Sequence, residues 1–285
     1  MIPAAFDYRS PDTIEEALSL LSKYREDAKV LTGGHSLIPA LKLRLATPAV
    51  VVDLRRIRGL AAIESAGDGV RIGALVTHHE VEASPLIKAR CPLLAEAAAA
   101  IGDVQVRNVG TLVGAVCHAD PAADYPAALL ALDAEVAVRG PRGQRSVRVG
   151  DFLQGVLATA LEPDEIAAAV TIPASRPASS AYLKVRQSAS GFAIVGVAAQ
   201  LQLEGGAARD VAVGVTGIAD RAFRAAAVEE ALRGKKLTEE AVRQAVTGIA
   251  KGRELLSDIH ASQEYRAHLA VVYARRAILL AASRS

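Results

Sequence analysis

The first 55 residues alternate between helix-like and strand-like patterns of apolar positions. A Thr-Ile-Glu-Glu capping box is followed by apolar residues at the spacing of one helix face, which predicts a helix over residues 13–24. Short apolar runs predict strands at 28–31 and 49–54, with a helix over 37–45 between them. This order of elements favours an α/β layer over a helical bundle or a β-sandwich.

A second segment of strands and helices starts near Gly69, where apolar and polar residues alternate as in a half-exposed strand. The same patterns predict four further elements, which are helices at 77–84 and 92–101 and strands at 134–138 and 166–172. Residues 102–124 follow neither period and are predicted to form a long irregular loop. Loops of that length in a compact domain are usually functional or disordered.

Residues 173–180, rich in Pro, Ser and Ala, are the best candidate for a linker. Beyond them the predicted elements are strands at 181–186, 194–203 and 211–218, then helices near 222–233, 238–251 and 263–282. Strands followed by helices indicate an α+β domain with an antiparallel sheet packed on helices. We therefore expect domains 1–175 and 176–285, the first with α/β subdomains of about 1–55 and 56–175.

Composition narrows the possible functions. The 33 Lys and Arg against 31 Asp and Glu leave a net charge of +2, without the basic excess of a nucleic-acid binder. Two cysteines are too few for an iron–sulfur cluster held by this chain alone, and they do not suggest a disulfide framework. No apolar run is long enough for a membrane segment, and the first residues lack the pattern of a signal peptide. We expect a cytoplasmic protein.

Two glycine-containing turns are the strongest candidates for chemistry. The first covers residues 31–39, between a predicted strand and helix, and the second covers 107–114. Glycine lets backbone N–H groups turn toward a ligand as an anion-binding nest, and a following helix adds its free N–H groups. Each turn alone is more often an ordinary tight turn, but two together would suit a diphosphate. The Rossmann, P-loop and serine-hydrolase signatures are absent from the sequence.

Other polar clusters suggest less. Cys117 and His118 are adjacent and match no common zinc spacing, so no metal ligand is predicted, and no catalytic residue either. Asp120 and Asp124 are interpreted as hydrogen-bond acceptors, for helix N-caps or for ligand hydroxyls. The His-His-Glu sequence at 78–80 is interpreted as the exposed start of a helix rather than as a ligand pair.

Taken together, the turns and their flanks resemble the FAD-binding medium subunits of the molybdenum hydroxylases, of the carbon monoxide dehydrogenase and xanthine dehydrogenase type. The two flavin-nucleotide turns of that family and its Ala-Asp-Pro-x-x-Asp sequence correspond to residues 32–37, 107–115 and 119–124. Residues 6–8 and 44–54 are similar too, and the resemblance covers the whole chain. It implies a PCMH-type FAD-binding domain and a C-terminal domain of the carbon monoxide dehydrogenase flavoprotein type.

The resemblance also implies which residues hold FAD. Residues 32–36 would line the pyrophosphate together with Thr111 and Gly114, and Asp124 would accept hydrogen bonds from the ribose side. The complete implied set is Leu31, Thr32, Gly33, Gly34, His35, Ser36, Leu37, Ile101, Gly102, Gly110, Thr111, Gly114, Ala115, Asp120, Asp124, Ile166, Lys184 and Phe192.

At the flavin end, the resemblance places Leu31, Ile101 and Gly102 near the flavin system and Phe192 close to the ring. Lys184 matches a family lysine near the isoalloxazine ring, where its positive charge would stabilise electron density on reduced flavin. The alternative for Lys184 is a solvated strand residue.

The second turn departs from the family at two positions. Val113 stands where the family usually has glycine, so the turn must be reachable at ordinary φ. Ala115 stands where the family has asparagine, which removes an amide that would bond to the cofactor. These departures put a contact at Ala115 in question without changing the resemblance.

The resemblance implies an oxidoreductase subunit that transfers electrons. A large subunit would carry the molybdenum–pterin cofactor, a small subunit would carry two [2Fe–2S] clusters, and this chain would carry FAD, in a dimer of heterotrimers. The implied substrate types are carbon monoxide, N-heterocycles, purines and aldehydes. The alternatives are a free-standing FAD-dependent oxidase of the PCMH type and a non-enzymatic nucleotide-binding scaffold.

Overall fold

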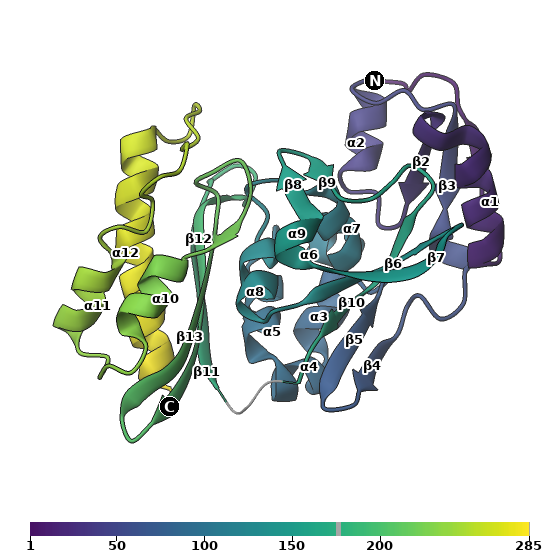
Figure 1. Cartoon of the computed structure of the whole chain (residues 1–285). Helices are drawn as coiled ribbons and strands as arrows, with labels where there is room; N and C mark the ends of the chain where they lie inside the picture. The colour runs from purple at the N-terminus through teal and green to yellow at the C-terminus, as the bar shows by residue number, and fades with distance from the viewer. Residues whose placement is uncertain (175–177, 285) are drawn as a thin grey trace.

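The described residues form three larger β-sheets, which follow one another along the chain, and one two-stranded hairpin (Figure 1). The computed structural model describes residues 1–174 and 178–284. The sheets have three, five and four strands, and helices cover them. This arrangement confirms the predicted combination of α/β and α+β layers.

The first sheet is parallel, in the order β1-β3-β2. Its elements are β1 (Asp7–Arg9), α1 (Ile14–Tyr24), the 3₁₀ turn η1 (Arg25–Asp27), β2 (Ala28–Leu31), α2 (Leu37–Lys42), β3 (Val50–Asp53) and the 3₁₀ turn η2 (Leu54–Arg56). The Thr13 hydroxyl accepts a hydrogen bond from the Glu16 N–H at 3.2 Å, which caps α1 as predicted. Helix α2 ends earlier than predicted, because Arg44 adopts a left-handed φ of 57° two residues after Lys42.

The second sheet is antiparallel, in the order β4-β5-β10-β6-β7. Its strands are β4 (Ile63–Ala66), β5 (Gly69–Gly73), β6 (Glu135–Gly140), β7 (Gly143–Arg148) and β10 (Ile166–Ile172). The helices that accompany it are α3 (His78–Ala83), α4 (Pro85–Arg90), α5 (Pro92–Ala99), α6 (Val104–Arg107), α7 (Leu112–His118), α8 (Tyr125–Ala131) and α9 (Val149–Phe152), with a small hairpin of β8 (Leu153–Gly155) and β9 (Ala158–Thr159). Strands β4 and β7, helices α4, α8 and α9 and the hairpin were not predicted.

Residues 102–124 were predicted to be irregular, but this prediction was wrong, because they contain helices α6 and α7. The Asp103 carboxylate accepts from the Val106 N–H at 2.9 Å and caps α6. The Thr111 hydroxyl accepts from the Gly114 N–H at 3.2 Å and caps α7. Helices this short show no clear period, so their caps were the only local signal.

The third sheet is antiparallel, in the order β11-β12-β13-β14. Its elements are β11 (Ser179–Arg186), β12 (Ala193–Glu204), β13 (Ala207–Thr216), β14 (Phe223–Arg224), α10 (Ala226–Leu232), α11 (Glu239–Val246) and α12 (Gln263–Ala282). Part of the predicted linker was wrong, because Ser179 and Ser180 already pair with β12. Residues 175–177 of that linker lie outside the described residues.

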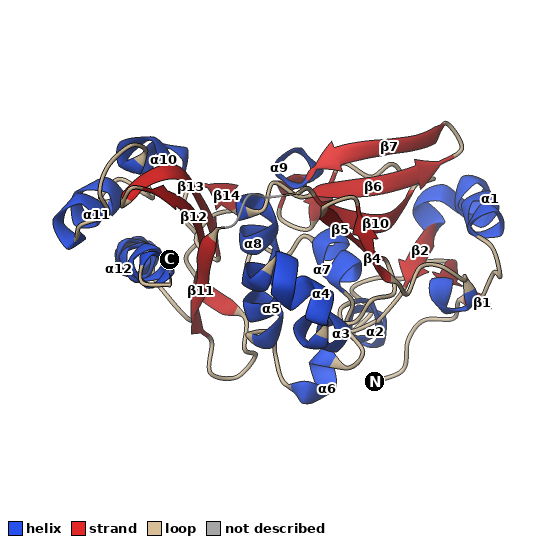
Figure 2. Cartoon of the chain, turned by 90° about the horizontal axis from the view of Figure 1, so that it is seen from below, coloured by secondary structure: helices blue, strands red, loops and turns tan. Residues whose placement is uncertain are grey.

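The third sheet lies between two layers of helices (Figure 2). Helices α5 and α8 of the preceding segment pack on one face, and α10 and α12 pack on the other. Side chains alternate along β11, so Tyr182 belongs to the core of the preceding segment and Ala181 to the core beneath α12. Gly214 permits this contact, since a Cβ there would overlap the Ala127 carbonyl oxygen. The third sheet therefore packs closely against α8.

Candidate functional site

The two glycine turns, far apart in the sequence, are in direct contact. The hydroxyl oxygens of Thr32 and Thr111 lie 2.9 Å apart. A Cβ on Gly33 would overlap the Val109 carbonyl oxygen, so the backbones of the two turns touch. A Cβ on Gly114 would lie 2.6 Å from the Thr111 hydroxyl and 2.9 Å from the Thr32 hydroxyl. Glycine is therefore required where the turns meet.

The first turn presents a row of unused backbone donors. The N–H groups from Gly33 to Leu37 donate no hydrogen bond to any described residue. Gly34 has a left-handed φ of 79°, which reverses the chain between β2 and α2, and Ser36 precedes α2 without a side-chain cap. Successive free N–H groups around such a turn form a nest that binds anions. These residues fit the diphosphate of a dinucleotide such as FAD.

Other predicted residues flank this turn in different environments. Leu31, at the end of β2, is 8% exposed, whereas His35 is exposed. Ala115 lies inside α7, half-buried, one residue beyond Gly114. Ile166 is 2% exposed in the central strand β10, within the core of the N-terminal part.

The second turn is held from behind by the start of α3. The His78 N–H donates to the Gly110 carbonyl at 2.9 Å, and Thr77 pairs with Thr111 in an antiparallel bridge. A Cβ on Gly110 would lie 2.6 Å from the His78 Nε2 atom. Glycine at this position therefore lets the imidazole ring pack directly under the turn.

The interpretation of His78 as an exposed residue was wrong. It is 5% exposed, because the capping box formed by Thr77 and Glu80 turns the start of α3 inward. Burial, with smaller contributions from the nearby charges of His35 and Arg107, lowers the pKa of His78 to about 4. The imidazole is therefore a neutral structural support.

The φ prediction for Val113 is confirmed. Val113 lies in α7, outside the positive-φ residues, and is 2% exposed in the core. The valine in place of glycine therefore adds core packing without straining the turn.

Arg107 fastens the second turn to the end of α5, a role that the sequence did not reveal. Its guanidinium donates to the Ile101 carbonyl at 2.9 Å and to the Glu82 carboxylate at 2.9 Å. Gly102, with a φ of 45°, follows immediately, and a Cβ on Gly191 would lie 3.4 Å from its Cα atom. Ile101 and Gly102 are thus brought beside the loop that joins β11 to β12.

Phe192 ends that loop and is 40% exposed. Its carbonyl accepts from the Gln187 N–H at 2.8 Å, and its N–H donates to the Ser190 hydroxyl at 3.2 Å. The loop is therefore closed on itself while the aromatic ring remains accessible.

The Ala-Asp-Pro-x-x-Asp segment is anchored to the C-terminal sheet. The Asp120 carboxylate accepts from the Ala122 N–H at 2.8 Å, which forms a tight turn. The Thr216 hydroxyl lies 2.8 Å from the carbonyls of both Pro121 and Ala123. Asp120 is thus a turn-forming acceptor and caps no helix, and its predicted bond to ligand hydroxyls stays a prediction.

Asp124 and Lys184 form a buried ion pair across the same boundary. The Lys184 Nζ atom donates to Asp124 Oδ2 at 2.8 Å and to the Ala100 carbonyl at 2.7 Å. The two side chains are 5% and 6% exposed, which excludes Lys184 as a solvated strand residue. Burial raises the pKa of Asp124, while Lys184 and Tyr182 oppose that rise. Asp124 makes no side-chain cap on α8, so its predicted capping role was wrong.

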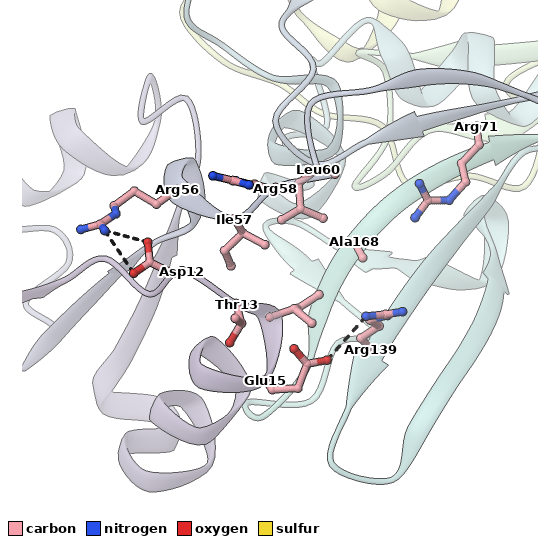
Figure 3. A pocket seen from close by; sticks show the side chains of 12 residues that line it. Asp12, Thr13, Glu15, Arg56, Ile57, Arg58, Leu60, Arg71, Arg139 and Ala168 are labelled. Atoms are coloured by element: carbon pink, nitrogen blue, oxygen red, sulfur yellow. Dashed lines mark hydrogen bonds and ion pairs between the residues drawn. The ribbon is translucent and has the colours of Figure 1, made fainter.

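A cleft lies away from these turns (Figure 3). It has a volume of about 650 Å³ and separates α1 from the five-stranded sheet. The Arg56–Asp12 ion pair (2.8 Å) and the Arg139–Glu15 ion pair (3.9 Å) lie along it. None of the predicted FAD residues lines this cleft.

The described residues hold no group of three or more His, Cys, Asp or Glu side chains arranged for a metal ion. None of their helices has the length and apolar character needed to cross a bilayer.

Comparison with known families divides almost the whole chain between two descriptions. Residues 4–175 match the FAD-binding domain in molybdopterin dehydrogenase. Residues 180–281 match the carbon monoxide dehydrogenase flavoprotein C-terminal domain.

Individual proteins are similar over their full length. The chain is 36% identical to the carbon monoxide dehydrogenase medium chain of Hydrogenophaga pseudoflava, covering 98% of this chain and 97% of the relative. It is 38% identical to the nicotine 6-hydroxylase medium subunit of Paenarthrobacter nicotinovorans, covering 99% of each. A solved carbon monoxide dehydrogenase structure from Hydrogenophaga pseudoflava superposes with a TM-score of 0.97 at 38% identity, covering 100% of this chain and 99% of that one. The chain belongs to the family of FAD-binding medium subunits of the molybdenum hydroxylases.

Proposed function

We propose that this chain is the FAD-carrying medium subunit of a heterotrimeric molybdenum hydroxylase. It would hold FAD between the [2Fe–2S] clusters of a partner subunit and an external electron acceptor. The observation that carries this function is the contact between the two turns at Thr32 and Thr111, next to the unused N–H groups of residues 33–37 in the first turn. FAD, when bound, exchanges electrons singly or in pairs, which suits a carrier between one-electron clusters and varied acceptors.

Each part of the site has a proposed role. Residues 32–36 hold the pyrophosphate through the backbone donors of the first turn, and the Thr32 and Thr111 hydroxyl groups complete the site with Gly110, Gly114 and Ala115 beside them. Leu31 and Leu37 flank the first turn, and Asp120 shapes the segment that leads to Asp124. The proposed flavin end consists of Ile101, Gly102, Ile166, Lys184 and Phe192. Its buried ammonium group would favour negative charge on reduced flavin.

The proposed domains are residues 1–175, with subdomains 1–55 and 56–175, and residues 176–285. The two largest hydrophobic cores of the described residues support this division, since one lies mainly among the first two sheets and the other between the third sheet and α12. The FAD residues come from both domains, so the C-terminal domain would complete the cofactor site.

The chemistry on the substrate would belong to a large molybdopterin subunit, and the clusters to a small iron–sulfur subunit. We propose carbon monoxide dehydrogenase-type or N-heterocycle, purine or aldehyde dehydrogenase activity for the complex. The names of the two relatives, which act with carbon monoxide and with nicotine, support this range. A dimer of heterotrimers in the cytoplasm completes the proposal.

The test is to purify the chain through a tag and record its absorption spectrum and its co-purifying subunits. We expect flavin bands, FAD released into the supernatant on acid precipitation, and two partners, one larger and one smaller. Flavin that stays in the pellet would indicate covalent attachment and favour a free-standing oxidase. A colourless chain that does not bind added FAD would contradict the proposed function.

A further inference from the structure

The side chain of Tyr182 on β11 occupies space above β12 that is open only because residue 196 is a glycine. Lys184 on β11 pairs with Gly196 on β12, and Tyr182 lies two residues earlier on the same face. A Cβ on Gly196 would overlap the Tyr182 hydroxyl and lie 2.8 Å from Thr216 Cγ2. The phenol therefore lies across its neighbouring strand, with its hydroxyl held at one place.

The Tyr182 hydroxyl is held at Oδ1 of Asp124, the carboxylate oxygen that Lys184 does not contact. The Tyr182 hydroxyl donates to Asp124 Oδ1 at 2.5 Å, while Lys184 donates to Asp124 Oδ2 at 2.8 Å. Tyr182 is 7% exposed and Asp124 is 4% exposed, so water has little access to this group. A buried carboxylate needs hydrogen-bond partners on both oxygens to remain ionised and fixed in orientation.

The backbone of Tyr182 is also held by a hydrogen bond, to the side chain of Glu96. Its N–H donates to the Glu96 carboxylate at 2.9 Å, and Arg284 donates to the other Glu96 oxygen at 2.6 Å. Glu96 lies on α5, four residues before Ala100, whose carbonyl accepts from Lys184. Tyr182 and Lys184 are therefore both tied to the same helix end.

The contacts leave Lys184 with one unused donor. An ammonium group has three N–H bonds, and two of them point to Asp124 and to the Ala100 carbonyl. The direction of the third is set by the first two. If the Asp124 carboxylate rotated, the Lys184 ammonium group would lose one of the two acceptors that fix its position and the direction of its third N–H bond.

We propose that Tyr182 is a positioning residue for FAD, which acts through Asp124 to fix the direction of the Lys184 ammonium beside Ile101 and Gly102. This role rests on the proposed function, because it requires FAD near Lys184. Tyr182 itself contacts the carboxylate rather than the cofactor. Its removal should therefore weaken the effect of Lys184 on FAD without removing the charge.

The readout is the midpoint potential of FAD in the assembled enzyme, followed by absorbance during a reductive titration. A fixed positive charge near flavin stabilises the negative charge of reduced FAD and raises the potential. We expect Lys184→Met to lower the potential, and Tyr182→Phe to lower it in the same direction by less.

A double variant separates positioning from general loosening. If Tyr182 acts through Lys184, Tyr182→Phe/Lys184→Met should have the same potential as Lys184→Met alone. The matched control is Tyr265→Phe, which changes a half-exposed tyrosine on α12 and should leave the potential unchanged. If Tyr182→Phe folds poorly, Gly196→Ala provides a second route, because the added Cβ would overlap the Tyr182 hydroxyl and displace it from Asp124 without changing any charge, and it should also lower the potential.

Two outcomes would overturn the inference in distinguishable ways. If Lys184→Met shifts the potential but Tyr182→Phe does not, or if their effects add, Tyr182 is only a packing residue and the proposed function stands. If the wild-type enzyme holds no flavin, the proposed function fails and the role of Tyr182 fails with it.

Discussion

The Thr32 and Thr111 hydroxyl oxygens lie 2.9 Å apart although the residues are 79 positions apart in the chain. Thr111 has a second task, since its hydroxyl also accepts from the Gly114 N–H and caps α7. Thr32 has no comparable capping bond. The two threonines therefore allow the contact between the turns to be separated from the stability of the helix.

We expect Thr32→Val to weaken FAD binding about fivefold, because the two turns are no longer joined, and to lower the free energy of unfolding by about 1 kcal/mol through the lost hydrogen bond. Thr111→Val should weaken binding at least as much and should lower the free energy of unfolding by about 2 kcal/mol, because it loses the cap of α7 as well. FAD fluorescence titration and urea unfolding measure the two effects.

The control for the lost cap is Thr238→Val, which removes the cap of α11 (Ala241 N–H to the Thr238 hydroxyl, 3.2 Å) far from the turns. It should cost similar stability and leave FAD binding unchanged. Equal FAD affinity in all three variants would show that the contact between the turns does not form part of the cofactor site.

Gly33→Ala should abolish FAD binding. The added Cβ would overlap the Val109 carbonyl oxygen, which is backbone and cannot swing aside, so the two turns must separate. Gly248→Ala is the matched control, because no atom lies within 4 Å of its Cβ position and its φ is ordinary. FAD titration of both variants, after a check of folding by circular dichroism, tests this prediction. Normal FAD affinity in Gly33→Ala would contradict it.

The parts of the fold that could be predicted are those with a local cause. The helix 13–24 and strands β11, β12 and β13 were predicted because their caps and apolar periods lie within one segment, whereas β14 falls inside the predicted helix 222–233. Helices α6 and α7 were missed because each is shorter than two helical turns, and so carries almost no period.

The site divides in the same way. Both glycine turns could be found from their local sequences, but their contact depends on how two sheets pack. The burial of His78 and the pairing of Tyr182 with Asp124 likewise arise from segments that meet only in the folded chain. Gly196 was not noticed in the sequence, because the side chain that needs its space belongs to a neighbouring strand.

Arg107 offers a test of how the second turn is held. We expect Arg107→Met to leave the Ile101 carbonyl and the Glu82 carboxylate without their guanidinium partner, and so to speed amide exchange over residues 101–110. FAD affinity should fall as that segment becomes less ordered. Hydrogen exchange followed by mass spectrometry measures the first effect.

Arg243→Met is the comparison for Arg107. Arg243 forms an exposed ion pair with Glu240 on α11, and such pairs contribute little to stability. It should leave exchange over residues 101–110 unchanged. Unchanged exchange in Arg107→Met would mean that the turn is held without the guanidinium.

His78 should make the chain less stable in mild acid. Its pKa is about 4 in the folded chain against an ordinary value of 6.5, so the unfolded chain binds more protons between these values. Stability from this residue is therefore complete above about pH 6.5 and is lost progressively as the pH falls toward 4. Between pH 7 and 5 the loss should be about 2 kcal/mol.

His78→Phe keeps an aromatic ring under Gly110 and removes the titration, so wild type should lose about 2 kcal/mol more than this variant over the same range. Urea unfolding at both pH values measures the difference, in which the other titrating groups cancel. Equal losses in the two proteins would show that His78 takes up its proton while the chain remains folded.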